Sequence, residues 1–128
     1  MVEPFSLPPG YKIQKFSQTF LDSLLYATTR GMAEIYIAEY RGEEVGRIVF
    51  VNTGAKYLIY VLNVSPEHRR KGIGSCLVQT VVRLADKPIY LSTYSAKNFY
   101  TRLGFTVEHE QEIFGFVYGY VMVLRPPA

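Results

Sequence analysis

The sequence predicts a single α/β (α+β) domain around a mixed, mostly antiparallel sheet of about seven strands. The first observation is a run of six aliphatic and aromatic residues, 57–62, followed by Pro66 and then by apolar residues at helical spacing. This order is typical of a buried strand, a turn and a helix. The second observation is that other strand candidates flank short glycine-containing turns, which indicates antiparallel hairpins. Third, 128 residues can bury one sizeable core but not two, so we expect one domain over residues 1–128.

The N-terminal half is expected to supply the first part of the sheet. Residues 12–16 alternate weakly and predict an edge strand, after which Ser17 would cap a helix through about Thr28, and Gly31 would end it. The following segments predict a hairpin and then a central strand: 35–40 and 45–50 around the turn 41–44, and 57–64 after the turn 52–54.

The C-terminal half is expected to complete the sheet. Ile73, Leu77, Val81 and Leu84 predict a helix that begins at about Gly72 and buries a broad face, which makes the next strand a parallel step. Later elements follow from breakers and periodicity: a strand at 89–93, a helix at 96–103 capped by Ser95 and closed by Gly104, and antiparallel strands at 105–113 and 116–124.

The start of the helix at Gly72 has the composition of an anion site. The first turn of a helix leaves backbone N–H groups without partners and carries partial positive charge. Gly72 and Gly74 remove side chains that would keep a ligand from the backbone, and three cations precede them, Arg69, Arg70 and Lys71. A phosphate or pyrophosphate is therefore predicted here. The spacing matches neither a P-loop nor the dinucleotide fingerprint, and the alternative is a solvated basic turn that caps a helix.

Composition excludes several other classes of protein. A net charge of +3 and a pI near 9.0 are only mildly basic, and the single cluster of cations argues against nucleic acid as a partner. No segment reaches 18 apolar residues, and residues 1–10 do not have the pattern of a signal peptide, so we expect no membrane association and a cytoplasmic location. Cys76 is the sole cysteine, and with only His68 and His109 in the chain we expect a small buried residue rather than a nucleophile, and no metal site.

Two spaced motifs carry a resemblance to a known family. The pattern Val64-x-Pro66-x-x-Arg69-x-x-Gly72-x-Gly74 is similar to the acetyl-CoA-binding motif of the GNAT N-acetyltransferases. The pattern Ala96-x-x-Phe99-Tyr100-x-x-x-Gly104-Phe105 resembles the next segment of that family, in the expected order. The resemblance extends over residues 12–124 and implies helices on both faces of the sheet. The chain departs from the family in a reduced N-terminal helical region, which would leave the acceptor groove open or have another subunit complete it in a homodimer.

The resemblance implies transfer of an acetyl group from acetyl-CoA to a primary amine of a small molecule or protein. The cofactor arm would pair with residues 62–64, where a main-chain N–H near Leu62 or Asn63 would polarise the thioester. Tyr100 would protonate the departing thiolate as the catalytic acid. The residues expected to bind the cofactor are Leu62, Asn63, Val64, Arg69, Arg70, Lys71, Gly72, Ile73, Gly74, Ser75 and Asn98.

The sequence does not identify a general base for the acceptor amine. The candidates are Glu34, Glu39, Glu44 and His109, and solvated charges on strand faces explain each of them equally well. Simple alternation would put Glu108, Glu110 and Glu112 on one face of their strand, and His109 and Gln111 on the other. Because no base is evident, a second function stays open: a non-catalytic CoA-binding or dimerisation module that retains the fold.

Overall fold

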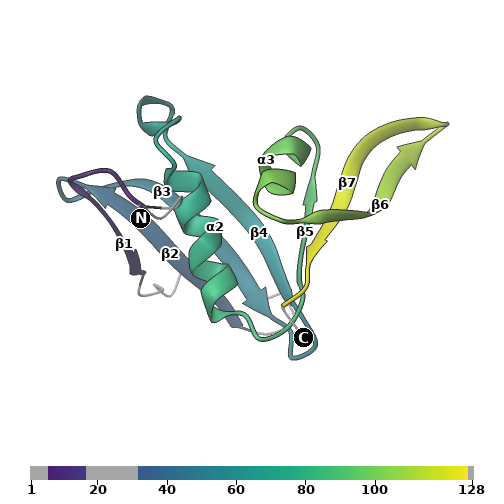
Figure 1. Ribbon diagram of the computed structural model, residues 1–128, viewed down its shortest axis with the longest axis horizontal. Helices are drawn as coiled ribbons and strands as arrows, with labels where there is room; N and C mark the ends of the chain where they lie inside the picture. The colour runs from purple at the N-terminus through teal and green to yellow at the C-terminus, as the bar shows by residue number, and fades with distance from the viewer. Residues whose placement is uncertain (1–5, 17–31, 127–128) are drawn as a thin grey trace.

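The structure is a computed structural model that describes residues 6–16 and 32–126, and its centre is one seven-stranded sheet (Figure 1). The strand order is β1-β2-β3-β4-β5-β7-β6, and all neighbours are antiparallel except β4 and β5. The elements are β1 (Tyr11–Lys15), β2 (Met32–Tyr40), β3 (Glu43–Asn52), β4 (Tyr57–Val64), η1 (Pro66–His68), α2 (Ile73–Leu84), β5 (Ile89–Thr93), α3 (Lys97–Arg102), β6 (Thr106–Ile113) and β7 (Phe116–Leu124).

This architecture confirms the predicted mixed sheet and its single parallel step. The β2–β3 hairpin turns through Arg41 and Gly42, which both have positive φ, as a two-residue hairpin turn requires. Phe114 and Gly115 repeat this geometry between β6 and β7. The helix expected between Ser17 and Thr28, with its end at Gly31, lies outside the described residues. No described helix has the length and apolar character needed to cross a membrane.

The apolar residues form two clusters on opposite faces of the sheet. The larger cluster combines strand residues such as Ile48 and Phe50 with Leu77 and Val81 of α2 and with Tyr100 of α3, so both described helices pack into it. The smaller cluster consists of Ala33, Ile35, Ile37, Val49 and Val51. Because successive side chains of a strand point to opposite faces, the continuous apolar run of β3 supplies both clusters.

The N-terminus of α3 differs from the prediction. Ala96, not Ser95, occupies the N-cap position, and its own side chain makes no cap hydrogen bond. Instead the hydroxyl oxygen of Thr93, the last residue of β5, accepts a hydrogen bond from the Ala96 N–H at 3.1 Å. The predicted cap by Ser95 was therefore wrong, because the hydroxyl of Thr93, three residues before Ala96, accepts this hydrogen bond instead.

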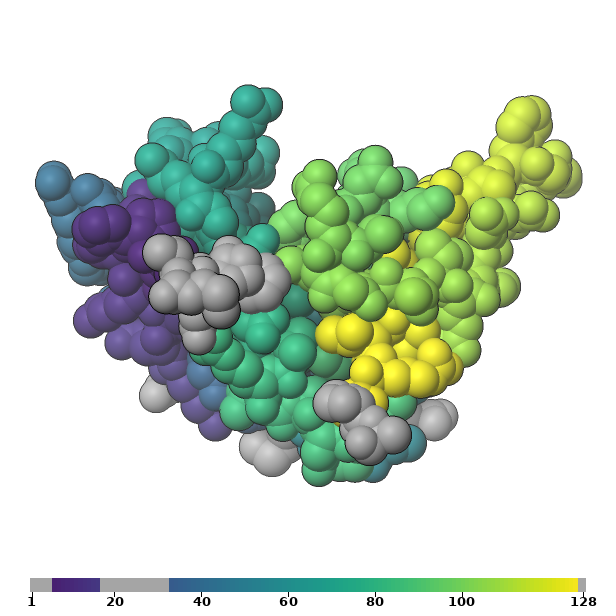
Figure 2. All heavy atoms as spheres, viewed as in Figure 1, coloured from purple at the N-terminus to yellow at the C-terminus, as the bar shows by residue number. Residues whose placement is uncertain are grey.

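An irregularity in β4 opens the middle of the sheet. Phe50 of β3 pairs with Ile59, and its neighbour Val49 pairs with Val61, which leaves Tyr60 as the extra residue of a β-bulge. Beside it, β4 and β5 are paired only through Tyr57 with Ile89 and Leu58 with Tyr90. Beyond these pairs the two strands diverge (Figure 1). Figure 2 shows a hollow between the segment that follows β4 and leads into α2 and the segment that follows β5 and forms α3.

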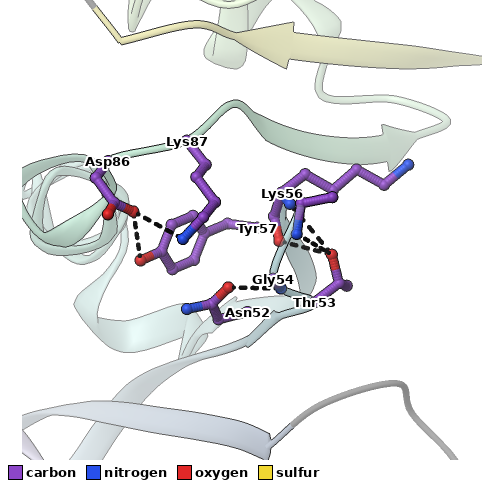
Figure 3. A network of polar contacts seen from close by, with 8 residues as sticks. Asn52, Thr53, Gly54, Lys56, Tyr57, Asp86 and Lys87 are labelled. Atoms are coloured by element: carbon purple, nitrogen blue, oxygen red, sulfur yellow. Dashed lines mark hydrogen bonds and ion pairs between the residues drawn. The ribbon is translucent and has the colours of Figure 1, made fainter.

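A network of polar contacts holds the closed end of this split together (Figure 3). The Tyr57 N–H donates to the Pro88 carbonyl oxygen at 2.8 Å, and the Tyr57 hydroxyl donates to Asp86 Oδ1 at 3.3 Å. Lys87 Nζ lies 3.3 Å from the same carboxylate oxygen and 5.8 Å from the centre of the Tyr57 ring. Burial, and then the neighbouring Asp86 charge, raise the pKa of Tyr57 above its usual value.

Candidate active site

The split leads into a cleft of about 660 Å³ between the end of β4, the start of α2 and α3. Its volume is within the usual range for sites that bind small molecules and cofactors. Its described lining comprises Leu62, Asn63, Val64, His68, Arg69, Arg70, Gly72, Ile73, Gly74, Ser75, Ser95, Ala96, Phe99 and Arg102. On the side of β5, the main chain of residues 59–64 has no strand partner within the described chain, so its polar groups on that side can pair with a ligand, apart from the Val64 carbonyl oxygen, which already accepts from Arg69.

The backbone before α2 presents the free amides of the helix to this cleft. Arg70 and Gly72 have positive φ, of 63° and 81°, and the chain enters the helix at Ile73. The first N–H groups of a helix have no intrahelical acceptor. A side chain at Gly72 would meet no atom within 4 Å, and one at Gly74 would lie 3.5 Å from the Phe99 ring, an ordinary contact. Packing within the protein therefore does not require glycine at position 74, and the glycine leaves the approach to these amides open.

The charged groups that line the cleft are basic. Arg69 Nε donates to the Val64 carbonyl oxygen at 2.8 Å, which ties the basic turn to the end of β4. Arg70 lies beside it, and Arg102 reaches the cleft from α3, while the described lining contains no carboxylate. His68 is held by the Tyr11 hydroxyl at 2.8 Å from its Nδ1 and lies near the Tyr40 ring. This arrangement suits a ligand with several negative charges.

The structure brings most of the predicted cofactor residues together in this lining, with the exception of Lys71 and Asn98. The sequence predicted no contact with the cofactor for the other lining residues, His68, Ser95, Ala96, Phe99 and Arg102. For Arg102 a signal was available, because it follows Phe99 by three residues and so lies on the same face of the helix. His68 becomes part of the site through Tyr11, which is 57 residues away in the sequence.

Tyr100, the predicted acid, belongs to the core cluster and is not part of the cleft lining, although its neighbour Phe99 is. The side chain of Tyr100 is 7% exposed and packs edge-on against Phe99 and Phe105, with ring centres 5.0 and 5.6 Å away. Burial raises its pKa, so the phenol is protonated at neutral pH. Its hydroxyl has no hydrogen bond within the described chain. Every fully buried side-chain oxygen there has a hydrogen-bond partner, so this hydroxyl is not fully buried. The hydroxyl thus keeps its proton available for a hydrogen bond that the described chain does not supply.

Cys76 faces the core rather than the cleft. It is 5% exposed, and burial raises the pKa of its thiol, which is the opposite of what a nucleophile needs. The expected small buried residue is confirmed. Within residues 6–16 and 32–126, no group of three or more potential ligands could hold a metal ion.

The candidate bases lie elsewhere on the sheet. Glu34 pairs with Lys15 at 3.3 Å, Glu39 with Lys12 at 3.6 Å, and Glu44 with Arg47 at 2.7 Å. His109 is exposed on β6, and β7 separates it from β5. None of these four residues lines the cleft.

The expected alternation of charges along β6 was wrong because the strand contains two register shifts. One shift lies between Val107 and His109, and the other between Gln111 and Glu112. Glu108 Oε1 consequently lies 3.5 Å from the Tyr90 hydroxyl, and Gln111 Oε1 lies 2.9 Å from Ser92 Oγ. Tyr90 and Ser92 are two residues apart on β5 and share one face of the sheet, so Glu108 and Gln111 share it as well.

Known proteins have the same fold. A structure of a GNAT family acetyltransferase from Elizabethkingia anophelis with acetyl-CoA bound superposes with a TM-score of 0.68, at 17% identity, over 92% of this chain and 99% of that one. Arabidopsis thaliana Naa50 in complex with the bisubstrate analogue CoA-Ac-MVNAL gives 0.67 at 19% identity, over 90% and 98%. The ribosomal-protein-S18-alanine N-acetyltransferase of Escherichia coli gives 0.73 at 12% identity, over 92% and 95%.

The sequence itself matches a family model. The model describes an acetyltransferase (GNAT) domain and covers residues 31–107, which is more than half of the chain and includes the cleft from Leu62 to Arg102. The chain therefore belongs to the GNAT family of acyl-CoA-dependent N-acetyltransferases.

Proposed function

We propose that the protein transfers an acetyl group from acetyl-CoA, bound in the cleft, to a primary amine. The observation that carries this proposal is the convergence of three features on one cleft: an unpaired strand edge, the free amides of a helix and several cations. A CoA molecule needs all three, because it combines an amide-containing arm with a pyrophosphate. The solved relative with acetyl-CoA bound supports the same ligand.

The residues present fit this ligand in two places. The amides of residues 73–75 and the side chains of Arg69 and Arg70 would hold the pyrophosphate, and the glycine at position 74 keeps the approach to those amides open. The edge of β4 from Leu62 to Val64 would pair with the amides of the arm, which directs the thioester toward the bulge at Tyr60.

The chain's own groups supply the remaining chemistry. A main-chain N–H near Leu62 would stabilise the oxyanion that forms when the amine nitrogen attacks the thioester carbon. That attack forms the C–N bond. The C–S bond breaks when the tetrahedral intermediate collapses, and Tyr100 gives its phenolic proton to the departing sulfur. The amine loses its proton to water, and solvent restores the phenol.

The first test is whether acetyl-CoA raises the melting temperature of the protein. We expect Gly72→Glu to abolish the shift, because a carboxylate at the anion site repels phosphate. Gly54→Glu is the matched control, since Gly54 also has positive φ, of 93°, meets nothing within 4 Å, and lies in the turn between β3 and β4. Equal shifts in the two variants would contradict the proposed cofactor site.

The second test is turnover, measured as thiol released from acetyl-CoA in the presence of amines. Release that depends on the amine and forms its N-acetyl derivative supports catalysis. Binding of acetyl-CoA without turnover of any amine would indicate the alternative function, a CoA-binding module that retains the fold.

A further inference from the structure

A second, smaller pocket lies at the foot of the same split. Its volume is about 310 Å³, and its described lining is Lys56, Leu58, Ile59, Tyr60, Tyr90, Leu91, Ser92 and Val121. Tyr90 and Ser92 alternate on β5 with Ile89 and Leu91, which belong to the helix-covered core. They therefore point to the other face of the sheet, and the pocket opens on the side away from α2.

The position of this pocket follows from the bulge in β4. Tyr60, the bulged residue, lines the pocket, and Leu62, two residues further on, lines the cofactor cleft. Two residues of strand span about 7 Å. If acetyl-CoA occupies the cleft as proposed, a molecule in the pocket faces the thioester from the opposite side of the sheet.

One lysine lines the pocket, and a carboxylate and a guanidinium lie at its edge, because Glu108 Oε1 and Arg125 Nη2 are each 3.5 Å from the Tyr90 hydroxyl. Lys56 is the only charged residue in the described lining, and its Nζ lies 4.8 Å from the centre of the Tyr90 ring. Within the described chain it has no carboxylate partner, whereas the nearby Glu108 lies 3.5 Å from Nη2 of Arg125. A cation that rests on an aromatic face without a counterion is available for an anionic ligand.

We propose that Lys56, Tyr60 and Tyr90 form an acceptor subsite for an apolar or aromatic amine that carries a carboxylate. The two phenol rings and Leu58 provide an apolar surface for the body of the amine. Lys56 pairs with the carboxylate and repels cationic acceptors such as polyamines. Amino acids with apolar side chains and aminobenzoates are the two sources of such an amine, and the volume of the pocket suits molecules of that size.

The absence of acidic groups from the described lining favours the less basic members of this class. A basic amine with a pKa of about 10 is almost entirely protonated at neutral pH and needs a base before it can attack. The described lining of the pocket contains no carboxylate and no histidine. An amine of lower basicity, such as an aminobenzoate, is neutral already and needs no base from the protein.

The experiment compares acceptors that differ only in the carboxylate, with acetyl-CoA as donor. Phenylalanine is paired with phenethylamine, and 4-aminobenzoate with aniline, and the products are quantified by mass spectrometry. We expect kcat/KM to be about tenfold higher for at least one carboxylate-bearing partner, as a charge-assisted contact allows. Equal or faster acetylation of both partners that lack the carboxylate would overturn the proposal.

Two lysines give a matched pair of variants. Lys56→Met should remove the preference for the carboxylate and leave KM for acetyl-CoA unchanged, and Lys56→Glu should reverse the preference. Lys87→Met is the control, because Lys87 also rests on a tyrosine ring, 5.8 Å from the centre of Tyr57, but lies outside the pocket. A preference that survives Lys56→Met, or that Lys87→Met removes equally, would contradict the assignment.

A binding measurement separates failure of the subsite from failure of the proposed function. Calorimetry with 4-aminobenzoate, in the presence and absence of CoA, needs no turnover. We expect binding to the parent to be at least tenfold tighter than binding to Lys56→Met. Equal affinities, or no binding, while acetyl-CoA still stabilises the protein, would refute the subsite alone. Loss of acetyl-CoA binding in the parent protein would refute the proposed function instead.

Discussion

Tyr57 and Tyr100 are two buried phenols with different surroundings. Both are 7% exposed, and burial raises the pKa of each. The Tyr57 hydroxyl is engaged by Asp86, whereas that of Tyr100 has no partner within the described chain. Tyr57 therefore has the contacts of a structural residue, whereas the hydroxyl of Tyr100 remains available for the proton transfer that we propose.

Substitution of each phenol by phenylalanine tests this difference. Tyr100→Phe keeps the ring between Phe99 and Phe105 and deletes only the donor, so kcat should fall by about a hundredfold or more with little change in affinity for acetyl-CoA. Tyr57→Phe is the control and should lower the melting temperature slightly while kcat stays near that of the parent. If Tyr100→Phe retains more than about a third of kcat while chemistry limits the rate, the acid is not Tyr100.

The same two pKa values set the alkaline limit of stability. A phenol whose pKa is higher in the folded state than in the unfolded state contributes stability that is complete below about pH 10, the unfolded value. That contribution is lost as the pH rises from there through the folded pKa. We expect the free energy of unfolding, measured with urea, to fall above pH 10, and to fall less in Tyr57→Phe and Tyr100→Phe. An identical alkaline decline in parent and variants would contradict the assigned shifts.

Among the elements, α2 matters most for the site, because its first turn combines helix formation with ligand access. Gly74 weakens the helix relative to alanine by roughly 0.5–1 kcal/mol. A methyl group there would meet Phe99 at an ordinary 3.5 Å, so the fold has room for it. The glycine thus gives up helix stability at the point where a ligand would approach the amides.

Gly74→Ala should therefore separate stability from binding. We expect a melting temperature equal to or above that of the parent without ligand, because alanine favours the helix, together with a weaker affinity for acetyl-CoA in calorimetry. Gln79→Ala, a residue of α2 outside the cleft lining, is the control and should leave the affinity unchanged. Unaltered affinity in Gly74→Ala would show that no ligand approaches this turn.

The elements themselves could be predicted because their signals are local. Hydrophobic periodicity and glycine turns gave β2 to β7, α2 and α3 to within a few residues. The β-bulges could not be predicted, since 57–62 is uniformly apolar and nothing in it distinguishes Tyr60 from its neighbours. For the same reason, the sequence did not predict that Glu108 and Gln111 share one face of the sheet. Basic and glycine residues indicated the cleft where we propose that the cofactor binds. The smaller pocket combines residues of separate strands around the bulge, so no sequence motif predicts it.

At the scale of the whole molecule, the sheet consists of two parts that share little main-chain pairing. The first part is β1 to β4, and the second is β5, β7 and β6. Two residue pairs join them, and the core under α2 spans both, with Phe50 from one part and Met122 from the other. A ligand that pairs with β4 inside the split would add to this connection.

Hydrogen exchange should detect that addition. We expect acetyl-CoA to slow the exchange of amides in residues 59–64 and 73–75, where main-chain groups await partners, and to leave those of the β2–β3 hairpin nearly unchanged. Gly72→Glu, under the same conditions, should show no such protection. Uniform slowing across the whole chain would indicate general stabilisation instead of pairing at the split.

The network around Tyr57, Asp86 and Lys87 fixes the closed end of the split, and Val64 and Ala96 lie at its open end, where they line the cleft. The six residues of β4 between Tyr57 and Val64 correspond to a distance of about 20 Å. A rotation of about 5° between the two strands at the closed end therefore moves the open end by about 2 Å, enough to break a hydrogen bond. Asp86→Ala removes both side-chain contacts and should therefore weaken the binding of a ligand that Asp86 never touches, whereas Tyr57→Phe and Lys87→Met each leave one of the two contacts in place.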